Sequence, residues 1–541
     1  MERRASSPVR LGGDARCSTD PDRLARFRFP ANSFLISAMT SKLLRLGFTF
    51  ILLAAFFLPA FAADRNSDRE IADRLIAEAL KPSPLETNLR RLSDEIGGRI
   101  PGTPAFQRAV DWGVAAFKDA GADSVHTEEF TIQHSWAEGA TEMTASLYSG
   151  TTFPIHAVSV AWAPALAAAK HVPIVDVGEG SAAEFAKVGD VAGRIVLVHT
   201  KVLGNWDDLF GEYERAPAII ALAVKGKAKA IAFMATREHG ILYRHTNSGA
   251  GEIDALPQVI VAREDGERIA RLLASANPVW ADLSIPNKIG AAIKTWNVVA
   301  EIRGEVRDNE KPAEFVVLGA HLDSWELGTG ALDNGCNAVL VIDALRAIKA
   351  SGLKPRRSIR FILFSGEEEG MIGSRAYAVA HRNELDKAAG VVIFDAGTGK
   401  TTAFSTGGRK DVIPAAQSML APLQQFGVIK ADPTAESGTD HFDFMLEGVP
   451  TFVADQDEAN YLENYHATTD TFDKVDFVQL KKHVAEAAEF TFALANAADR
   501  IGPRLNRAQI EQTLHETHLD QELKDMGMWD EWASGKRGRE Q

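Results

Sequence analysis

The sequence predicts an α/β protein with a mostly parallel central sheet covered by helices on both faces. From residue 296 onward, short continuous apolar runs such as 315–320 alternate with helical patterns such as 337–352. Strands that are apolar on both faces and separated by helices are typical of parallel sheets buried between helical layers. In the segment 135–292, short β-rich runs alternate instead with alanine-rich helical stretches, which predicts a smaller inserted domain.

The elements are expected in a simple order along the chain. Residues 67–125 read as helices around a loop rich in glycine and proline, "DEIGGRIPGTPA". After the inserted domain, the apolar runs predict five strands, over 297–304, 315–321, 360–366, 390–396 and 449–455. A long helix over 477–498 is expected to close the main domain. The charged tail 503–541 is expected to be frayed or disordered.

Residues 39–62 have the pattern of a secretory signal peptide. Lys42 and Arg45 precede an apolar run that ends at Leu58, and "AFA" then supplies small residues at a cleavage site. The apolar run is short for a membrane span, which needs about 20 residues. The sequence therefore predicts a secreted or periplasmic protein without a stable membrane span after cleavage.

The position of this signal also sets the expected domain boundaries. Signal peptides begin at the initiator methionine, so we interpret 1–38 as an upstream extension from a misassigned start codon and Met39 as the true start. The mature chain is expected to begin near Ala63. The main domain is then expected in two segments, 63–134 and 293–502.

Composition excludes some classes of function. The chain has 541 residues, 45% of them hydrophobic and 24% charged, which is ordinary for a globular protein of two or three domains. The net charge of −14 argues against a nucleic acid partner, because no basic stripe is present to neutralise phosphates. Only Cys17 and Cys336 occur, and loss of Cys17 with the leader would leave no internal disulfide.

Ionisable residues follow several predicted strands of the main sheet. In open parallel sheets, ligands bind beyond the carboxyl ends of the strands. The residues in question are His321, Asp323, Asp333, Glu367, Glu368, Glu369, Asp395, Tyr465, His466 and Asp470. Each alone has an ordinary explanation, since a histidine at a strand end is usually hydrogen-bonded and a run of glutamates is usually solvated. Together they require a counter-charge.

A divalent metal supplies that charge best. Neither "HLDSWELGTGALDNG", from residue 321, nor "SGEEEG", from residue 365, contains a lysine or arginine that could pair with the carboxylates. Imidazole nitrogens combined with carboxylate oxygens suit zinc, whereas calcium and magnesium prefer oxygen ligands alone. The sequence therefore predicts a zinc site at the strand ends.

Four ordered motifs resemble a known family. "HLDSW…LDNG", "SGEEEGMIGSRAY", "IFDAG" and "YHATTDT" are similar to those of the co-catalytic di-zinc aminopeptidases and glutamate carboxypeptidases. "HLDSWELGTGALDNG" is most similar to the carboxypeptidase Q branch. The resemblance covers residues 67–500, implies the zinc exopeptidase fold, and makes 135–292 similar to the protease-associated domain of many members.

The resemblance implies a ligand set for two Zn²⁺ per chain. His321 and Asp395 would hold one ion, Glu368 and His466 the other, and Asp333 would bridge them. In this family the peptide bond after the bridging aspartate is often cis.

It also implies the catalytic roles. Glu367 would be the general base, acting on a water that bridges the zinc ions, and Tyr465 would support the oxyanion. Asp323 is expected to accept the second ring N–H of His321, and Asp470 is expected to support the ligands. The substrate would be a dipeptide or short peptide, and family analogy suggests a homodimer.

Two other functions remain open on the same fold. A single-zinc transferase like glutaminyl cyclase would use one metal, and a catalytically inactive binding scaffold would use none. Separately, Arg244 and His245 in the inserted domain are candidates to cap the cleft and bind a substrate carboxylate, although such a loop is more often purely structural.

Overall fold

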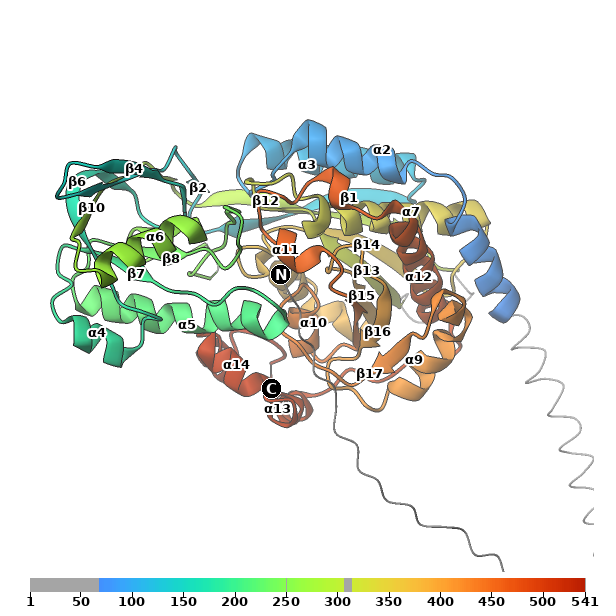
Figure 1. The fold of residues 1–541 in the computed structure, drawn as a ribbon. Coiled ribbons are helices and arrows are strands. Elements are labelled where there is room, and N and C mark those ends of the chain that lie inside the picture. Colours follow the sequence, from blue (N-terminus) through green and yellow to red (C-terminus); the bar gives the residue numbers. More distant parts are fainter. Residues whose placement is uncertain (1–67, 250, 306–313, 541) are drawn as a thin grey trace, which may run out of the picture. The chain divides into compact units, whose positions relative to one another are not determined.

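The computed structural model describes residues 68–249, 251–305 and 314–540 (Figure 1). Among these residues the main sheet has eight strands, in the order β1-β12-β14-β13-β15-β18-β16-β17. Its strands are β1 Ser124–Ile132, β12 Ile293–Ile302, β13 Phe315–His321, β14 Ser358–Phe364, β15 Ala388–Ile393, β16 Thr401–Ser405, β17 Lys430–Asp432 and β18 Thr451–Gln456.

The centre of this sheet is parallel, as predicted, but the sheet as a whole is mixed. β14, β13, β15 and β18 run parallel to one another. β12 is antiparallel to β14, and β16 is antiparallel to β18. The prediction of a mostly parallel sheet therefore holds for the central strands, and it missed the antiparallel pairs that β12 and β16 form with their neighbours. The direction of a strand depends on the partner with which it pairs, and the residues of β12 do not encode its pairing with β14.

Helices cover both faces of the main sheet (Figure 1). Successive strand residues point to opposite faces, so Leu318 of β13 packs in one apolar layer and Val317 in the other. The first layer contains α3 Pro104–Asp119, α7 Cys336–Ser351 and α12 Phe477–Asn496, and the second contains α8 Ile372–Ala380 and α10 Phe442–Leu446. The helices predicted over 337–352 and 477–498 correspond to α7 and α12.

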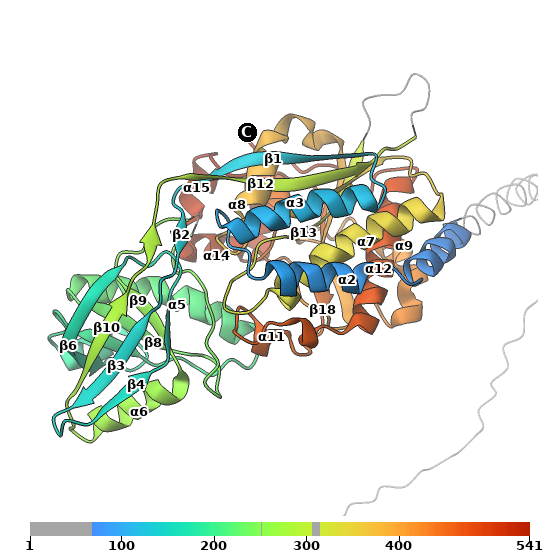
Figure 2. The ribbon, with the colours of Figure 1, turned by 90° about the horizontal axis from the view of Figure 1, so that it is seen from above.

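The residues between β1 and β12 form a second sheet with apolar clusters of its own (Figure 2). The chain enters through β2 Trp136–Ala137 and returns through β11 Lys288–Ile289, which pair antiparallel. The strand order is β4-β3-β10-β6-β7-β8-β9-β5. The elements are β3 Glu142–Leu147, β4 Thr152–Ile155, β5 Ala157–Ser159, β6 Leu166–Asp176, α4 Ala182–Val188, β7 Ile195–Val198, α5 Trp206–Lys225, β8 Ala230–Met234, β9 Gln258–Val261, α6 Arg263–Ala274 and β10 Val279–Ile285.

The C-terminal residues are folded, so the prediction of a frayed tail after residue 503 is wrong. They form α13 Arg507–Glu516, α14 Leu519–Asp525 and α15 Trp529–Ala533. Leu514 and Trp532 pack in an apolar cluster with Phe442 of α10. Arg537 donates two hydrogen bonds, of 2.9 and 2.8 Å, to the carboxylate of Asp443. The tail was predicted to be disordered because it is rich in charged residues, but this cluster buries the apolar residues that lie among them.

No helix within the described ranges is long and apolar enough to span a bilayer. The predicted signal peptide, 39–62, and the predicted extension, 1–38, lie outside the described residues.

Candidate metal centre

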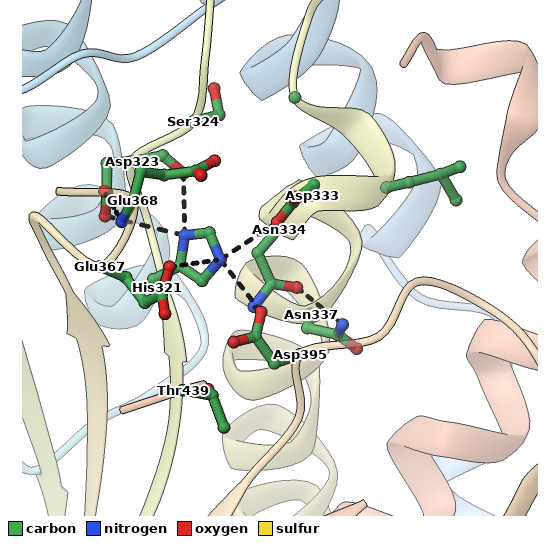
Figure 3. Close-up of polar contacts among 12 residues, drawn as sticks. His321, Asp323, Ser324, Asp333, Asn334, Asn337, Glu367, Glu368, Asp395 and Thr439 are labelled. Atoms are coloured by element: carbon green, nitrogen blue, oxygen red, sulfur yellow. Dashed lines mark hydrogen bonds and ion pairs between the residues drawn. The ribbon is translucent and has the colours of Figure 1, made fainter. Parts of the chain in front are cut away.

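The predicted ligands of the central strands leave the main sheet at one edge. His321 is the last residue of β13, Glu367 and Glu368 follow β14, and Asp395 follows β15. Because β13 is parallel to both neighbours, their carboxyl ends meet at this edge. Figure 3 shows these side chains converging from separate segments of the chain.

Two groups of donor atoms share one carboxylate. His321, Asp333 and Asp395 form the first group, and Asp333, Glu368 and His466 form the second; within each group the donor atoms lie within 4.8 Å of one another. His321 Nε2 lies 3.2 Å from Asp333 Oδ1 and 3.0 Å from Asp395 Oδ1. His466 Nε2 lies 2.8 Å from Glu368 Oε2 and 3.3 Å from Asp333 Oδ2. The structure thus brings the five predicted ligands together, with Asp333 between the groups.

The carboxylates of this cluster are buried close together and would be stabilised by a cation. Burial lowers the pKa of His321, but the carboxylates of Asp395 and Asp333 overcome this effect and hold it well above its usual value. Burial, followed by the charge of Asp333, raises the pKa of Glu368 well above its usual range. One oxygen of Asp333 and one of Glu368 are buried without a hydrogen-bond partner among the described residues. Imidazole and carboxylate donors with this need for positive charge fit zinc.

Asp470 holds the backbone that carries Asp333. Its carboxylate accepts hydrogen bonds from the N–H groups of Ala331 at 3.0 Å, Leu332 at 2.7 Å and Asp333 at 3.1 Å. The predicted supporting residue therefore acts through the main chain and not on a ligand side chain. The peptide bond between Asp333 and Asn334 is cis, as predicted.

Asp323 is the acceptor beside the second ring nitrogen of His321, as predicted, but through its main-chain carbonyl and not through its carboxylate. The ring nitrogen Nδ1 of His321 lies 3.1 Å from the main-chain carbonyl oxygen of Asp323 and 3.7 Å from its carboxylate (Figure 3). That carboxylate accepts a hydrogen bond of 3.2 Å from the N–H of Glu368. The carbonyl two residues after the ring is the nearer acceptor, which leaves the side chain free to hold the neighbouring ligand segment.

Arg99 is a structural residue of the site that sequence reasoning missed. Its fully buried guanidinium donates hydrogen bonds to the carbonyl oxygens of Leu322 at 2.7 Å, Thr329 at 2.9 Å and Gly330 at 2.8 Å. It thereby joins the segment after β13 to the loop that carries Asp333. The motif "DEIGGRIPGTPA" indicated only a loop, and no local pattern revealed these distant partners.

Asn334 is a second missed residue. Its side-chain amide donates to Asp395 Oδ1 at 2.6 Å and to the carbonyl oxygen of Phe394 at 3.1 Å. Asn337 in turn donates to Asn334 Oδ1 at 2.7 Å. Its place beside the predicted bridging aspartate was the only available signal.

Arg244 and His245 do not line the cavity beside the predicted ligands, so the prediction that they bind a substrate carboxylate there is wrong. The side chain of Arg244 is fully buried and pairs with Glu138 and, at 2.6 Å, with Glu326. His245 Nδ1 lies 3.5 Å from Glu212 Oε1. A buried guanidinium needs such carboxylate partners, and these leave Arg244 no room for a ligand.

A cavity of about 390 Å³ opens onto the ligands. The predicted base Glu367 and the predicted oxyanion support Tyr465 both line it. One face of α5, a helix from the segment that forms the second sheet, lines part of this cavity. Its lining residues are Trp206, Leu209, Phe210 and Tyr213. The main domain adds Glu436 and Asp455. No lysine or arginine from the described part of the chain lines this cavity.

Comparison with known families identifies this region. Residues 297–491 match the model of peptidase family M28. They form an M28 peptidase domain. The match confirms the predicted family resemblance and enzyme class, a zinc-dependent metallopeptidase. The M28 domain runs from within β12 through β18 and includes all five predicted metal ligands.

Relatives extend the similarity beyond the M28 domain. Carboxypeptidase Q of Bos taurus is 27% identical over 428 residues, which cover 76% of this chain and 85% of the relative. Carboxypeptidase Q of Mus musculus is 26% identical over 418 residues, with 76% and 86% coverage. The crystal structure of a peptidase M28 precursor from Shewanella amazonensis covers 82% of this chain and 99% of its own, with TM-score 0.72 and 25% identity. These matches support the mixed α/β fold.

Proposed function

We propose that the chain is an exported exopeptidase that holds two zinc ions and hydrolyses short peptides. Asp333 carries this proposal, because both groups of donor atoms share its carboxylate. A transferase with a single zinc would leave one of the two groups without a role. A scaffold without catalysis would need neither group, nor a glutamate such as Glu367 placed at the cavity beside them.

The residues around the ligands support hydrolysis. Zinc, when bound, supplies Lewis acidity and lowers the pKa of water. Glu367 Oε2 lies 4.0 Å from His321 Nε2, and burial, with Asp395 adding to it, raises the pKa of Glu367 well above its usual value. In the proposed mechanism Glu367 accepts the proton of the attacking water and passes it to the leaving amine. The hydroxyl of Tyr465 donates to the oxyanion from the cavity wall.

The charge of the cavity supports recognition of an amino terminus. Burial and the charge of Asp455 raise the pKa of Glu436 to about 7, and burial raises the pKa of Asp455 to about 6. A substrate ammonium group would relieve the repulsion between these carboxylates. A carboxypeptidase would instead need a cation for the terminal carboxylate, and no described lysine or arginine lines the cavity. We therefore propose aminopeptidase polarity.

A peptide panel combined with metal analysis tests this function. The purified protein should contain two zinc ions per chain. Free and carboxy-amidated peptides should lose their first residue, whereas amino-acetylated peptides should resist. Release of the last residue from acetylated peptides would reverse the polarity. One zinc with cyclisation of amino-terminal glutamine would indicate the transferase, and absence of both zinc and turnover would indicate the scaffold.

A further inference from the structure

The second sheet reaches one of the predicted zinc ligands. The Nε2 atom of His466 belongs to the donor group with Asp333 and Glu368. On the other side of the ring, Nδ1 lies 3.4 Å from the hydroxyl oxygen of Tyr213, which is part of α5. That oxygen also lies 3.5 Å from the hydroxyl of Tyr465. Metal-binding histidines usually donate the other ring N–H to an oxygen, which fixes the tautomer and the ring orientation.

A second segment, which connects β8 to β9, holds the backbone around His466. The N–H of Arg244 donates to the carbonyl oxygen of His466 at 2.9 Å. The guanidinium of Arg237 donates to the carbonyl oxygen of Tyr465 at 2.8 Å. The N–H of Thr468 donates to the carbonyl oxygen of Leu242 at 2.9 Å. The loop that carries His466 is therefore hydrogen-bonded to the connection between β8 and β9 on both sides of this ligand.

We propose that Tyr213 is a positioning residue for His466, so that the second sheet completes the metal centre. The hydroxyl oxygen of Tyr213 accepts the Nδ1–H of His466, which leaves the lone pair of Nε2 directed toward Asp333 and Glu368. The hydrogen bonds from Arg237 and Arg244 to the backbone at Tyr465 and His466 keep the His466 ring next to Tyr213 of α5. This inference rests on the proposed binding of zinc by His466, and it gives the second sheet a role in metal affinity.

The variant Tyr213→Phe tests the inference, because it removes the hydroxyl and keeps the ring in the cavity wall. Zinc affinity is measured by competition with a chelator of known affinity. The affinity of one of the two sites should fall about 10- to 100-fold, the usual effect of losing such a partner. At limiting zinc kcat should fall, excess zinc should restore it, and KM should stay near the wild-type value.

Tyr377→Phe is the matched control. Tyr377 is also buried and accepts a hydrogen bond of 2.9 Å from Arg360, but it contacts no predicted ligand. This control should lower the melting temperature of the zinc-free protein at least as much as Tyr213→Phe and keep wild-type zinc affinity. Wild-type affinity in Tyr213→Phe, or an equal loss in both variants, would overturn the inference. A wild-type protein that binds no zinc would instead overturn the proposed function.

Discussion

Asp470 holds the backbone of Asp333, the residue that both donor groups share. Its carboxylate holds three consecutive N–H groups that end at Asp333, and Asp333 is the one residue common to both groups. Arg99 holds the preceding carbonyl, that of Gly330. The carboxylate of Asp333 is therefore placed by side chains that are not themselves ligands.

Replacing Asp470 with asparagine should weaken both zinc sites together. The amide keeps one acceptor oxygen but turns its NH₂ toward backbone N–H groups, which leaves at least one of them unpaired at a cost of roughly 1–3 kcal/mol. We expect a lower melting temperature and reduced zinc affinity at both sites in a chelator titration. Asp473→Asn, at an exposed aspartate paired with Lys474, should leave both quantities unchanged. Loss at one site alone would mean that Asp470 does not act through Asp333.

Glu367 and Glu368 should respond differently to the same substitution. Glu367→Gln should lower kcat about 10²- to 10⁴-fold, because the amide accepts no proton, and should leave zinc content near wild type. Glu368→Gln should lower zinc affinity, because a neutral amide replaces an anionic ligand, and excess zinc should restore part of the rate. A zinc titration of both variants checks this. The reverse pattern would assign the base to Glu368.

At the scale of elements, the buried strands could be predicted, but the direction in which the outer strands run could not. β15 is apolar throughout, β13 is apolar before His321, and β14 is apolar from Phe361 to its end; continuous burial requires such runs. The antiparallel direction of β12 depends on pairing with distant β14, which the run of β12 does not encode. The C-terminal helices escaped prediction because their apolar residues, Leu514 and Trp532 among them, are dispersed among charges.

The long helix α12 carries a buried acid with a consequence for stability. Burial raises the pKa of Glu489 to about 8, and the positive charge of Arg69 offsets only part of this increase. The carboxyl of an unfolded glutamate has a pKa of about 4.3. Between about pH 4.3 and about pH 8 the folded state therefore binds the proton more tightly than the unfolded state does. The free energy of unfolding then falls as the pH rises, by at most ~1.4 kcal/mol per pH unit. Glu489→Gln should therefore raise the melting temperature relative to wild type more at pH 8 than at pH 5.

The exposed substitution Glu511→Gln, in α13, is the control for this measurement. It should shift the melting temperature little at either pH. An equal shift of Glu489→Gln at both values would show that Glu489 is already ionised in the folded protein.

At the scale of the whole molecule, the sequence predicted which residues bind metal better than it predicted what places them. From the strand ends and the ordered motifs we predicted that His321, Asp333 and His466 bind metal together, and in the structure they belong to two adjoining donor groups. Arg99 and Tyr213 act on loops more than 200 residues away, and such contacts have no local pattern. The homodimer and the protease-associated character of the second sheet stay predictions, and light scattering would test the first.

Export should depend on the segment that starts at Met39. Deleting residues 1–38 should leave secretion and activity unchanged, because the basic residues, the apolar run and the cleavage site all lie after it. Amino-terminal sequencing of the exported protein should find Ala63 or a close neighbour. An exported chain that begins well before residue 50 would contradict the signal peptide.

The pairing of β2 with β11 has a consequence for how this architecture can change. The chain departs from the main domain and comes back at two adjacent points, Ala137 opposite Lys288. A short linker across those points could replace the whole intervening segment, since closing a small loop costs little entropy. An ancestral gene could thus acquire or discard the segment in a single recombination event. Once α5 had come to support His466, however, excision would weaken the proposed zinc site to which His466 belongs, which would make the acquisition hard to reverse.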